Sequence, residues 1–143
     1  MAEQATIDTV AARVSAGLMG QLATVLTDDR PRYATGTARI PRAQSWVTRA
    51  YARFWQRLPF AQSVAPGYGL FAVNAAGRAR WAEFPAIISD DTFVRLQFLP
   101  LERTQTPAPY DWPMIEGFAA LTRVRRLEAR VGGVARLTIF RLL

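Results

Sequence analysis

Two adjacent carboxylates, Asp90 and Asp91, follow Ser89 and precede the apolar-rich segment 92–98. Ser89 is a good N-cap, so both acids are expected in the first turn of a helix, where the helix dipole favours negative charge. Paired acids in that position can hold a general base close to a bound divalent ion or a hydroxyl group. The alternative is a capped helix N-terminus, where the two acids only stabilise the helix through its dipole. The residue types by themselves favour this structural interpretation.

A second candidate is a cluster of arginines toward the end of the chain. Arg123 and Arg126 share one side of a predicted helix with Arg130, and Arg125 lies between them in the sequence. Guanidinium groups bind phosphate in a bidentate manner, so the cluster could hold a phosphorylated ligand. A solvated helix face, with arginines complementing the C-terminal dipole, is the equal alternative.

Glycines and tryptophans supply weaker candidates. Gly67 and Gly69 flank Tyr68 before an apolar strand, where they could let a ligand or another backbone approach closely. A simple turn is the favoured interpretation, because the glycines match neither phosphate-loop nor dinucleotide fingerprints. Among the tryptophans, Trp55 falls on an apolar helix face, whereas Trp81 and Trp112 lie beside loops and could stack on sugars or bases.

Composition excludes several chemistries. The 143 residues contain no Cys and no His, which removes disulfides, thiolate catalysis, Ser–His–Asp hydrolysis and nearly all catalytic zinc sites. Every one of the 18 basic residues is Arg, against 11 acidic residues, and the net charge is +7. This charge predicts an anionic partner. The chain has no run of 18 apolar residues and its N-terminal residues do not resemble a signal peptide, so a cytoplasmic location is expected.

The elements that must position these residues alternate between helices and short strands, which predicts one α/β domain. Leu18, Leu22, Val25 and Leu26 share one face of the first helix, which Ser15 can cap. Gly36 lies inside the first strand and suggests a sheet edge. The second helix has an apolar face of Val47, Tyr51, Phe54, Trp55 and Leu58, with Arg49, Arg53 and Arg57 on its other side. Helices are expected at 14–26, 45–58, 90–98 and 113–130, and strands at 33–40, 69–73 and 103–108.

Two segments, GLFAVNAAGRARW at 69–81 and FPAIISDDTFVRL at 84–96, resemble the later half of a bacterial family 2 glycosyltransferase. In that family an acidic pair followed by an apolar residue and Arg opens a helix under the acceptor site. Asp90 and Asp91 match the pair, with Phe93 and Arg95 in the corresponding places. The segments PRYATGT at 31–37 and SWVTRAYAR at 45–53 fit the region before it, so the resemblance runs from about Val14 to Arg126.

The resemblance implies part of a GT-A fold, a Rossmann-like nucleotide-binding half joined to an acceptor-binding half, with the first half missing. It implies inverting transfer from a nucleotide-sugar donor, with Mg²⁺ or Mn²⁺ bridging the diphosphate. Asp91 would be the base for the acceptor hydroxyl and Asp90 would orient the site. Asp8 matches only one acid of the expected Asp-x-Asp metal motif, since Val10 occupies the second place. Further substrate-binding residues would be Gly69, Arg95, Trp112, Arg123 and Arg126, the last two neutralising the leaving diphosphate.

The match to the processive-synthase motif is loose, at residues 123–127, so the resemblance implies a non-processive type. Because the donor-binding half is missing, little or no transferase activity by itself is expected. Self-association, or a partner chain that completes the sheet, would cover the edge left by the missing half. The competing interpretation is a non-catalytic basic module that binds nucleic acid or another anionic partner through Arg49, Arg53 and Arg57. Contact with a membrane surface ranks third, since no strongly basic amphipathic anchor is visible.

Overall fold

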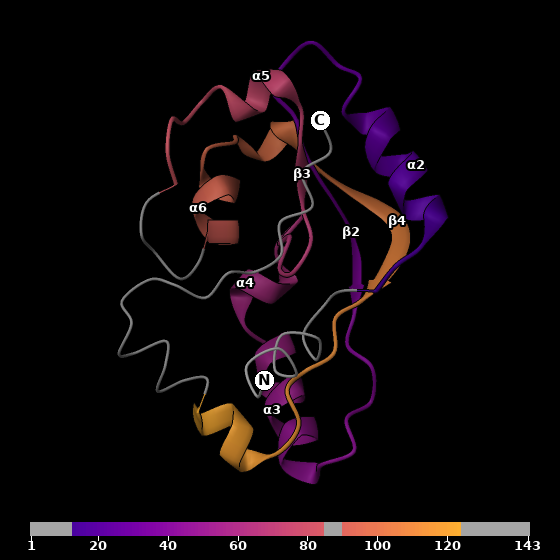
Figure 1. Ribbon diagram of the computed structural model, residues 1–143, viewed down its shortest axis with the longest axis vertical. Helices are drawn as coiled ribbons and strands as arrows, with labels where there is room; N and C mark the ends of the chain where they lie inside the picture. The colour runs from indigo at the N-terminus through magenta and orange to yellow at the C-terminus, as the bar shows by residue number, and fades with distance from the viewer. Residues whose placement is uncertain (1–12, 85–89, 124–143) are drawn as a thin grey trace, which may run out of the picture.

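The structure, a computed structural model, describes residues 13–84 and 90–123, except for the side chain of Asp90. Within these ranges the chain forms a mixed four-stranded sheet with helices on both faces, which confirms the α/β class (Figure 1). The strand order is β1 (Arg13–Val14), β4 (Arg103–Asp111), β2 (Tyr33–Arg39) and β3 (Ala72–Val73). No helix in the described part of the chain is long and apolar enough to cross a membrane.

The parallel pair β2–β4 is the centre of the sheet, and the short strands β1 and β3 add to it in antiparallel fashion. The expected edge position of β2 is therefore wrong, since β2 has neighbours on both sides. Gly36 is needed for a different reason. A Cβ there would lie 2.8 Å from the Leu18 side chain and 2.9 Å from the Ala108 carbonyl oxygen, where the β2–β4 register shifts.

Helix α2 (Ala16–Val25) covers one face of the sheet. The side chain of Ser15 accepts a hydrogen bond from the backbone N–H of Leu18, so the expected cap is confirmed. Leu18 and Leu22 are fully buried, as their spacing predicts, because they pack on the small and aromatic residues of the strands. Their partners in this core are Ala34, Leu70, Ala72, Ala108 and Tyr110.

A second core covers the opposite face, under α5 (Ala75–Arg78), α6 (Asp90–Leu96) and the 3-10 turn η1 (Pro100–Glu102). Tyr33 points into this core while its neighbour Ala34 points into the first one, as the alternation of a strand requires. The segment 70–72 is buried as predicted, although only Ala72–Val73 pair as β3. The core consists of Tyr33, Ala65, Phe71, Trp81, Val94 and Phe98.

Helix α3 (Trp46–Gln56), followed by α4 (Pro59–Gln62), packs at the lower end of the sheet in Figure 1. It docks through Thr48, whose hydroxyl donates to the carbonyl of Ile115 and accepts from the N–H of Gly117. This contact turns Thr48 and Ala52 inward and leaves Phe54 62% exposed, so the expected apolar face is wrong at Phe54.

The last described helix starts later than the sequence suggests. A helix from residue 113 was expected, but helical residues begin at 118 and reach the end of the described range at 123. Asp111 still belongs to β4, and the backbone N–H of Trp112 donates to the carbonyl of Arg39 at 2.8 Å. This bond extends the β2–β4 pairing by one residue, and the Thr48 hydroxyl then bonds the carbonyl of Ile115 and the N–H of Gly117 just before the helix begins.

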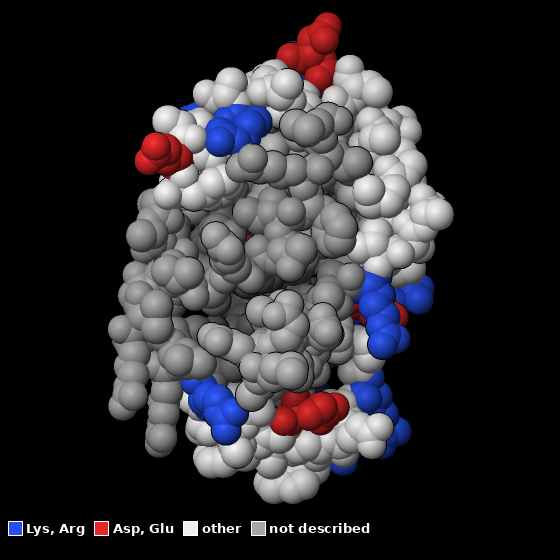
Figure 2. All heavy atoms as spheres, in the orientation of Figure 1, with Lys and Arg blue, Asp and Glu red and all other residues white. Residues whose placement is uncertain are grey.

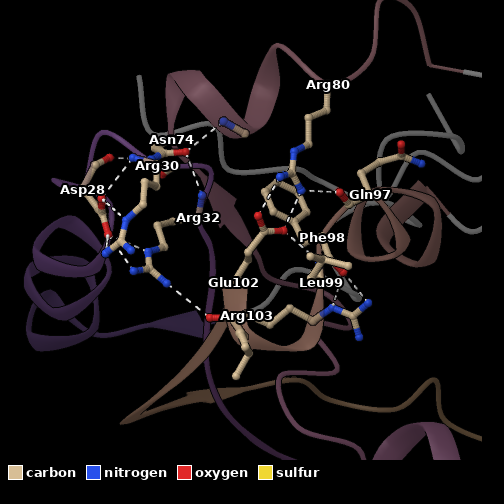
Figure 3. A network of polar contacts seen from close by, with 12 residues as sticks. Asp28, Arg30, Arg32, Asn74, Arg80, Gln97, Phe98, Leu99, Glu102 and Arg103 are labelled. Atoms are coloured by element: carbon tan, nitrogen blue, oxygen red, sulfur yellow. Dashed lines mark hydrogen bonds and ion pairs between the residues drawn. The ribbon is translucent and has the colours of Figure 1, made fainter.

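A polar network ties the turn after α2 to the start of α5 (Figure 3). The Asn74 amide donates to the carbonyls of Asp28 and Arg30, both at 2.7 Å, and its oxygen accepts from the N–H groups of Arg32 and Gly77. The Asp28 carboxylate accepts from Arg30 and Arg32, and these hydrogen bonds lower its pKa below the ordinary range. The network therefore fixes the ends of three elements with one amide side chain.

A bidentate ion pair between Arg80 and Glu102, also drawn in Figure 3, joins the residues after α5 to η1. Arg80 donates to both oxygens of Glu102 at 2.6 Å and also to the carbonyl of Gln97. Glu102 in turn accepts from the N–H of Leu99 at the start of η1. Because these bonds join the residues after α5 to the end of α6, they set the position of the helix that carries Asp91.

Candidate active site around residues 63–69 and helix α6

A tightly bent segment, residues 63–69, contacts candidate residues from two parts of the chain, Arg95 on α6 and Trp112 after β4. Three of its residues have left-handed backbone angles, Ala65 at φ +51°, Gly67 at +68° and Gly69 at +75°. A left-handed alanine is strained, and such strain persists only where neighbours impose it. Here the Ala65 N–H donates to the Gln105 side chain, and its carbonyl accepts from Arg95. Buried strain of this kind is typical of functional sites.

Arg95, which was predicted to bind substrate, holds this segment to α6. Its guanidinium donates to the carbonyls of Ala65 and Val64 and to the hydroxyl of Ser63. Partial burial, followed by the charge of Arg103, lowers its pKa from the ordinary value. Arg95 therefore acts on segment 63–69, one turn of helix away from Asp91.

The Tyr33 side chain lies against the same segment at Gly67. Its side chain is completely buried, and its hydroxyl has no hydrogen-bond partner among the described residues. Burial raises the pKa of Tyr33 far above the ordinary value, and the nearby Asp91 charge raises it further. A Cβ on Gly67 would overlap this hydroxyl, so only glycine fits there.

Gly69 and Trp112, both predicted to bind substrate, are in direct contact. A Cβ on Gly69 would lie 2.4 Å from Cδ1 of Trp112, so the indole rests on the glycine backbone. Trp112 also packs against Tyr68 and Trp55, with both ring centroids 5.1 Å away, and the Tyr68 carbonyl accepts from the Tyr110 hydroxyl. The structure thus brings these two residues together inside an aromatic cluster.

Asp91 lies in the first turn of α6 and is partly exposed, as the helix prediction requires. Its carboxylate accepts from the N–H of Thr92 at 2.6 Å. Its charge also adds to the effect of burial in raising the pKa of Tyr110, whose hydroxyl bonds segment 63–69. Asp90 shares this first turn, but only its backbone is described. Asp91 is therefore a partly exposed carboxylate on the helix that Arg95 ties to segment 63–69.

Other candidates lie elsewhere. Arg123 is exposed on the helix at 118–123, which Figure 1 places well below α6, so it does not share a site with Asp91. Arg126, Asp8 and the cap residue Ser89 lie outside the described residues. Within residues 13–84 and 90–123, no group of three or more acidic residues that could hold a metal ion is found.

Two contributors to this site were missed from the sequence, Tyr33 and Gln105. Neither carries a local signal, because each contacts segment 63–69 from more than thirty positions away along the chain. Gly67 did carry one, since a glycine between Pro66 and Tyr68 predicts a turn. Comparisons with protein-family models, with curated proteins and with solved structures found no match to this chain.

Proposed function

We propose that this chain is the acceptor-side part of an inverting glycosyltransferase that uses a nucleotide-sugar donor. The observation that carries the proposal is the position of Asp91, a partly exposed carboxylate in the first turn of α6, the helix that Arg95 joins to the strained segment 63–69. The resemblance of segments 69–81 and 84–96 to family 2 glycosyltransferases supports it, as does a mixed sheet with a parallel central pair.

In this proposal Asp91 accepts the proton of the acceptor hydroxyl as that oxygen attacks the anomeric carbon. The bond to the nucleoside diphosphate breaks, and the configuration at the anomeric carbon inverts. Asp90 orients the site, and Arg95 keeps segment 63–69 in place above α6. Mg²⁺ or Mn²⁺ would supply charge neutralisation at the diphosphate. No step is assigned through the ion here, because the described residues contain no group of three acids that could hold it.

Nucleoside diphosphate release tests the assignment of Asp91. The chain is incubated with UDP-, GDP- and dTDP-sugars, and we expect slow release from one of them. Asp91→Asn should lower that rate by about 10²–10⁴-fold, the usual contribution of a general base. Asp29→Asn, at an exposed position in the turn after α2, is the matched control and should leave the rate unchanged. An unchanged rate in Asp91→Asn would exclude this role, and rapid transfer by the wild type would contradict the expected low activity.

The competing interpretation, a module that binds nucleic acid through Arg49, Arg53 and Arg57, gains less support. Arg53 and Arg57 are exposed on α3, as a binding face requires. Arg49, however, turns back and donates to the carbonyls of Ala43 and Gln44. The row therefore does not present three outward guanidinium groups to an extended polyanion.

A further inference from the structure

A depression of about 380 Å³ lies between the end of β2 and helix α3. Its volume is in the range of small-molecule sites. Three of the residues around it are arginines, Arg42 from the loop after β2 and Arg49 and Arg53 from α3. The other lining residues are small or apolar with one amide: Ile40, Pro41, Ala43, Ala52 and Gln56.

One of the three guanidinium groups is fixed in place. Arg49 donates to the carbonyl of Ala43 at 3.0 Å and to that of Gln44 at 2.6 Å. The loop that supplies these carbonyls is itself held, because Glu116 accepts from the N–H groups of Gln44 and Ser45 at 2.8 and 3.0 Å. A ligand at this place would meet an arginine that loses little conformational entropy on binding.

The three arginines form no ion pair with the described acids. The ion pairs found within residues 13–84 and 90–123 involve Asp28 or Glu102, and none involves Arg42, Arg49 or Arg53. Glu116, the acid bonded to the same loop, has both carboxylate oxygens engaged by backbone N–H groups. Figure 2 shows several basic side chains, with acidic ones between them, on the lower part of the molecule, where α3 and the end of β2 lie in Figure 1.

We propose that the depression lined by Arg42, Arg49 and Arg53 binds a compact phosphate-bearing anion. Guanidinium forks match phosphate oxygens, and three of them around a concave surface suit a single phosphate or diphosphate group. The phosphate belongs either to a soluble molecule or to a lipid headgroup. The site uses none of the residues assigned to sugar transfer, so it does not depend on the proposed function.

The first test is a calorimetric titration of the full chain with inorganic pyrophosphate at low ionic strength. We expect saturable binding that weakens about tenfold in Arg53→Gln and in Arg42→Gln, through loss of one charge-assisted contact each. Neither arginine has a hydrogen bond or ion pair with another described residue, so both variants should fold. Arg57→Gln removes the same charge from the exposed end of α3, outside the depression, and should change affinity less than about twofold.

The second test distinguishes the source of the phosphate. Vesicles of phosphatidylcholine with phosphatidylglycerol are compared with vesicles of phosphatidylcholine only. Binding of pyrophosphate without vesicle binding assigns a soluble ligand, and vesicle binding that weakens in Arg53→Gln but not in Arg57→Gln assigns a lipid headgroup. The proposal is overturned if the chain binds neither pyrophosphate nor vesicles, or if Arg57→Gln weakens binding as much as Arg53→Gln does. It is also overturned if, of these probes and a duplex DNA added as a further probe, the chain binds only the DNA.

Discussion

Replacing Gly67 with alanine is expected to lower the free energy of unfolding by about 3–4 kcal/mol, from left-handed strain plus overpacking. The backbone at this residue has φ +68°, and the new Cβ would overlap the Tyr33 hydroxyl and lie 2.9 Å from its Cζ. Neither group can move easily, because Tyr33 is fully buried between Phe71 and Phe98. Urea unfolding followed by tryptophan fluorescence measures the change.

Gly20→Ala is the matched control for this prediction. Gly20 lies inside α2 with nothing within 4 Å of the place that an added methyl group would take, and its backbone angle is not left-handed. Alanine should therefore stabilise the protein by about 0.5–1 kcal/mol through helix propensity. The same chemical change is thus expected to have opposite signs at the two glycines, and equal effects would contradict the arrangement of segment 63–69.

The double variant Tyr33→Phe/Gly67→Ala separates the clash from the strain. Tyr33→Phe should be neutral or stabilising by itself, because the buried hydroxyl has no partner among the described residues. In the double variant the overlap with the hydroxyl disappears while the left-handed strain stays. We expect a coupling of about 1–2 kcal/mol in favour of the pair. Strict additivity would show that the Tyr33 hydroxyl does not lie under Gly67.

Asn74→Ala is the second variant with a large expected effect, a loss of about 3–4 kcal/mol at roughly 1 kcal/mol per hydrogen bond. The side chain makes four hydrogen bonds, two as donor and two as acceptor, and one of these caps α5. Truncation leaves the N–H groups of Arg32 and Gly77 and the carbonyls of Asp28 and Arg30 without this partner. Urea unfolding again provides the measurement.

Two comparisons make the Asn74 result specific. Asn74→Asp keeps the acceptor for the N–H of Gly77 and, when its carboxyl is protonated, one of the two donors, so at low pH it should fall between wild type and Asn74→Ala. Asp29→Asn changes an exposed side chain in the same turn and should alter stability by less than about 0.5 kcal/mol. A loss below about 1 kcal/mol in Asn74→Ala would show that the network does not hold this turn.

Local signals predicted the elements that depend on neighbours in the chain. Ser15 and the Leu18–Leu22 spacing predicted α2, and the segment 33–40, mostly small residues ended by Pro41, predicted β2. The acidic first turn of α6 was also predicted. In each case residues within about one turn or one strand carry the signal.

Features set by distant contacts escaped prediction. Gly36 suggested an edge, but the Leu18 side chain and the Ala108 carbonyl decide its role. Pro113 suggested a helix start, but residues 112–116 are not helical, and Thr48 from α3 bonds Ile115 and Gly117. The candidate site shows the same contrast. Asp91 was predicted from its neighbours in the sequence, whereas the contact of Tyr33 with Gly67 joins residues that are distant in the sequence.

The measurement that tests the central claim most directly is a thermal-shift titration of the wild-type chain with UDP-, GDP- and dTDP-sugars, with and without Mn²⁺. A ligand that binds only the folded state raises the melting temperature. The account predicts a rise of about 2–4 °C for one nucleotide class, as expected from about 1 kcal/mol of linkage in a domain of this size. Because Asp91 acts on the acceptor hydroxyl and not on the nucleotide, the rise should persist in Asp91→Asn as well as in Asp29→Asn, while nucleoside diphosphate release should fall only in Asp91→Asn. No rise with any of the three, or a release rate that Asp91→Asn leaves unchanged, would contradict the proposed function.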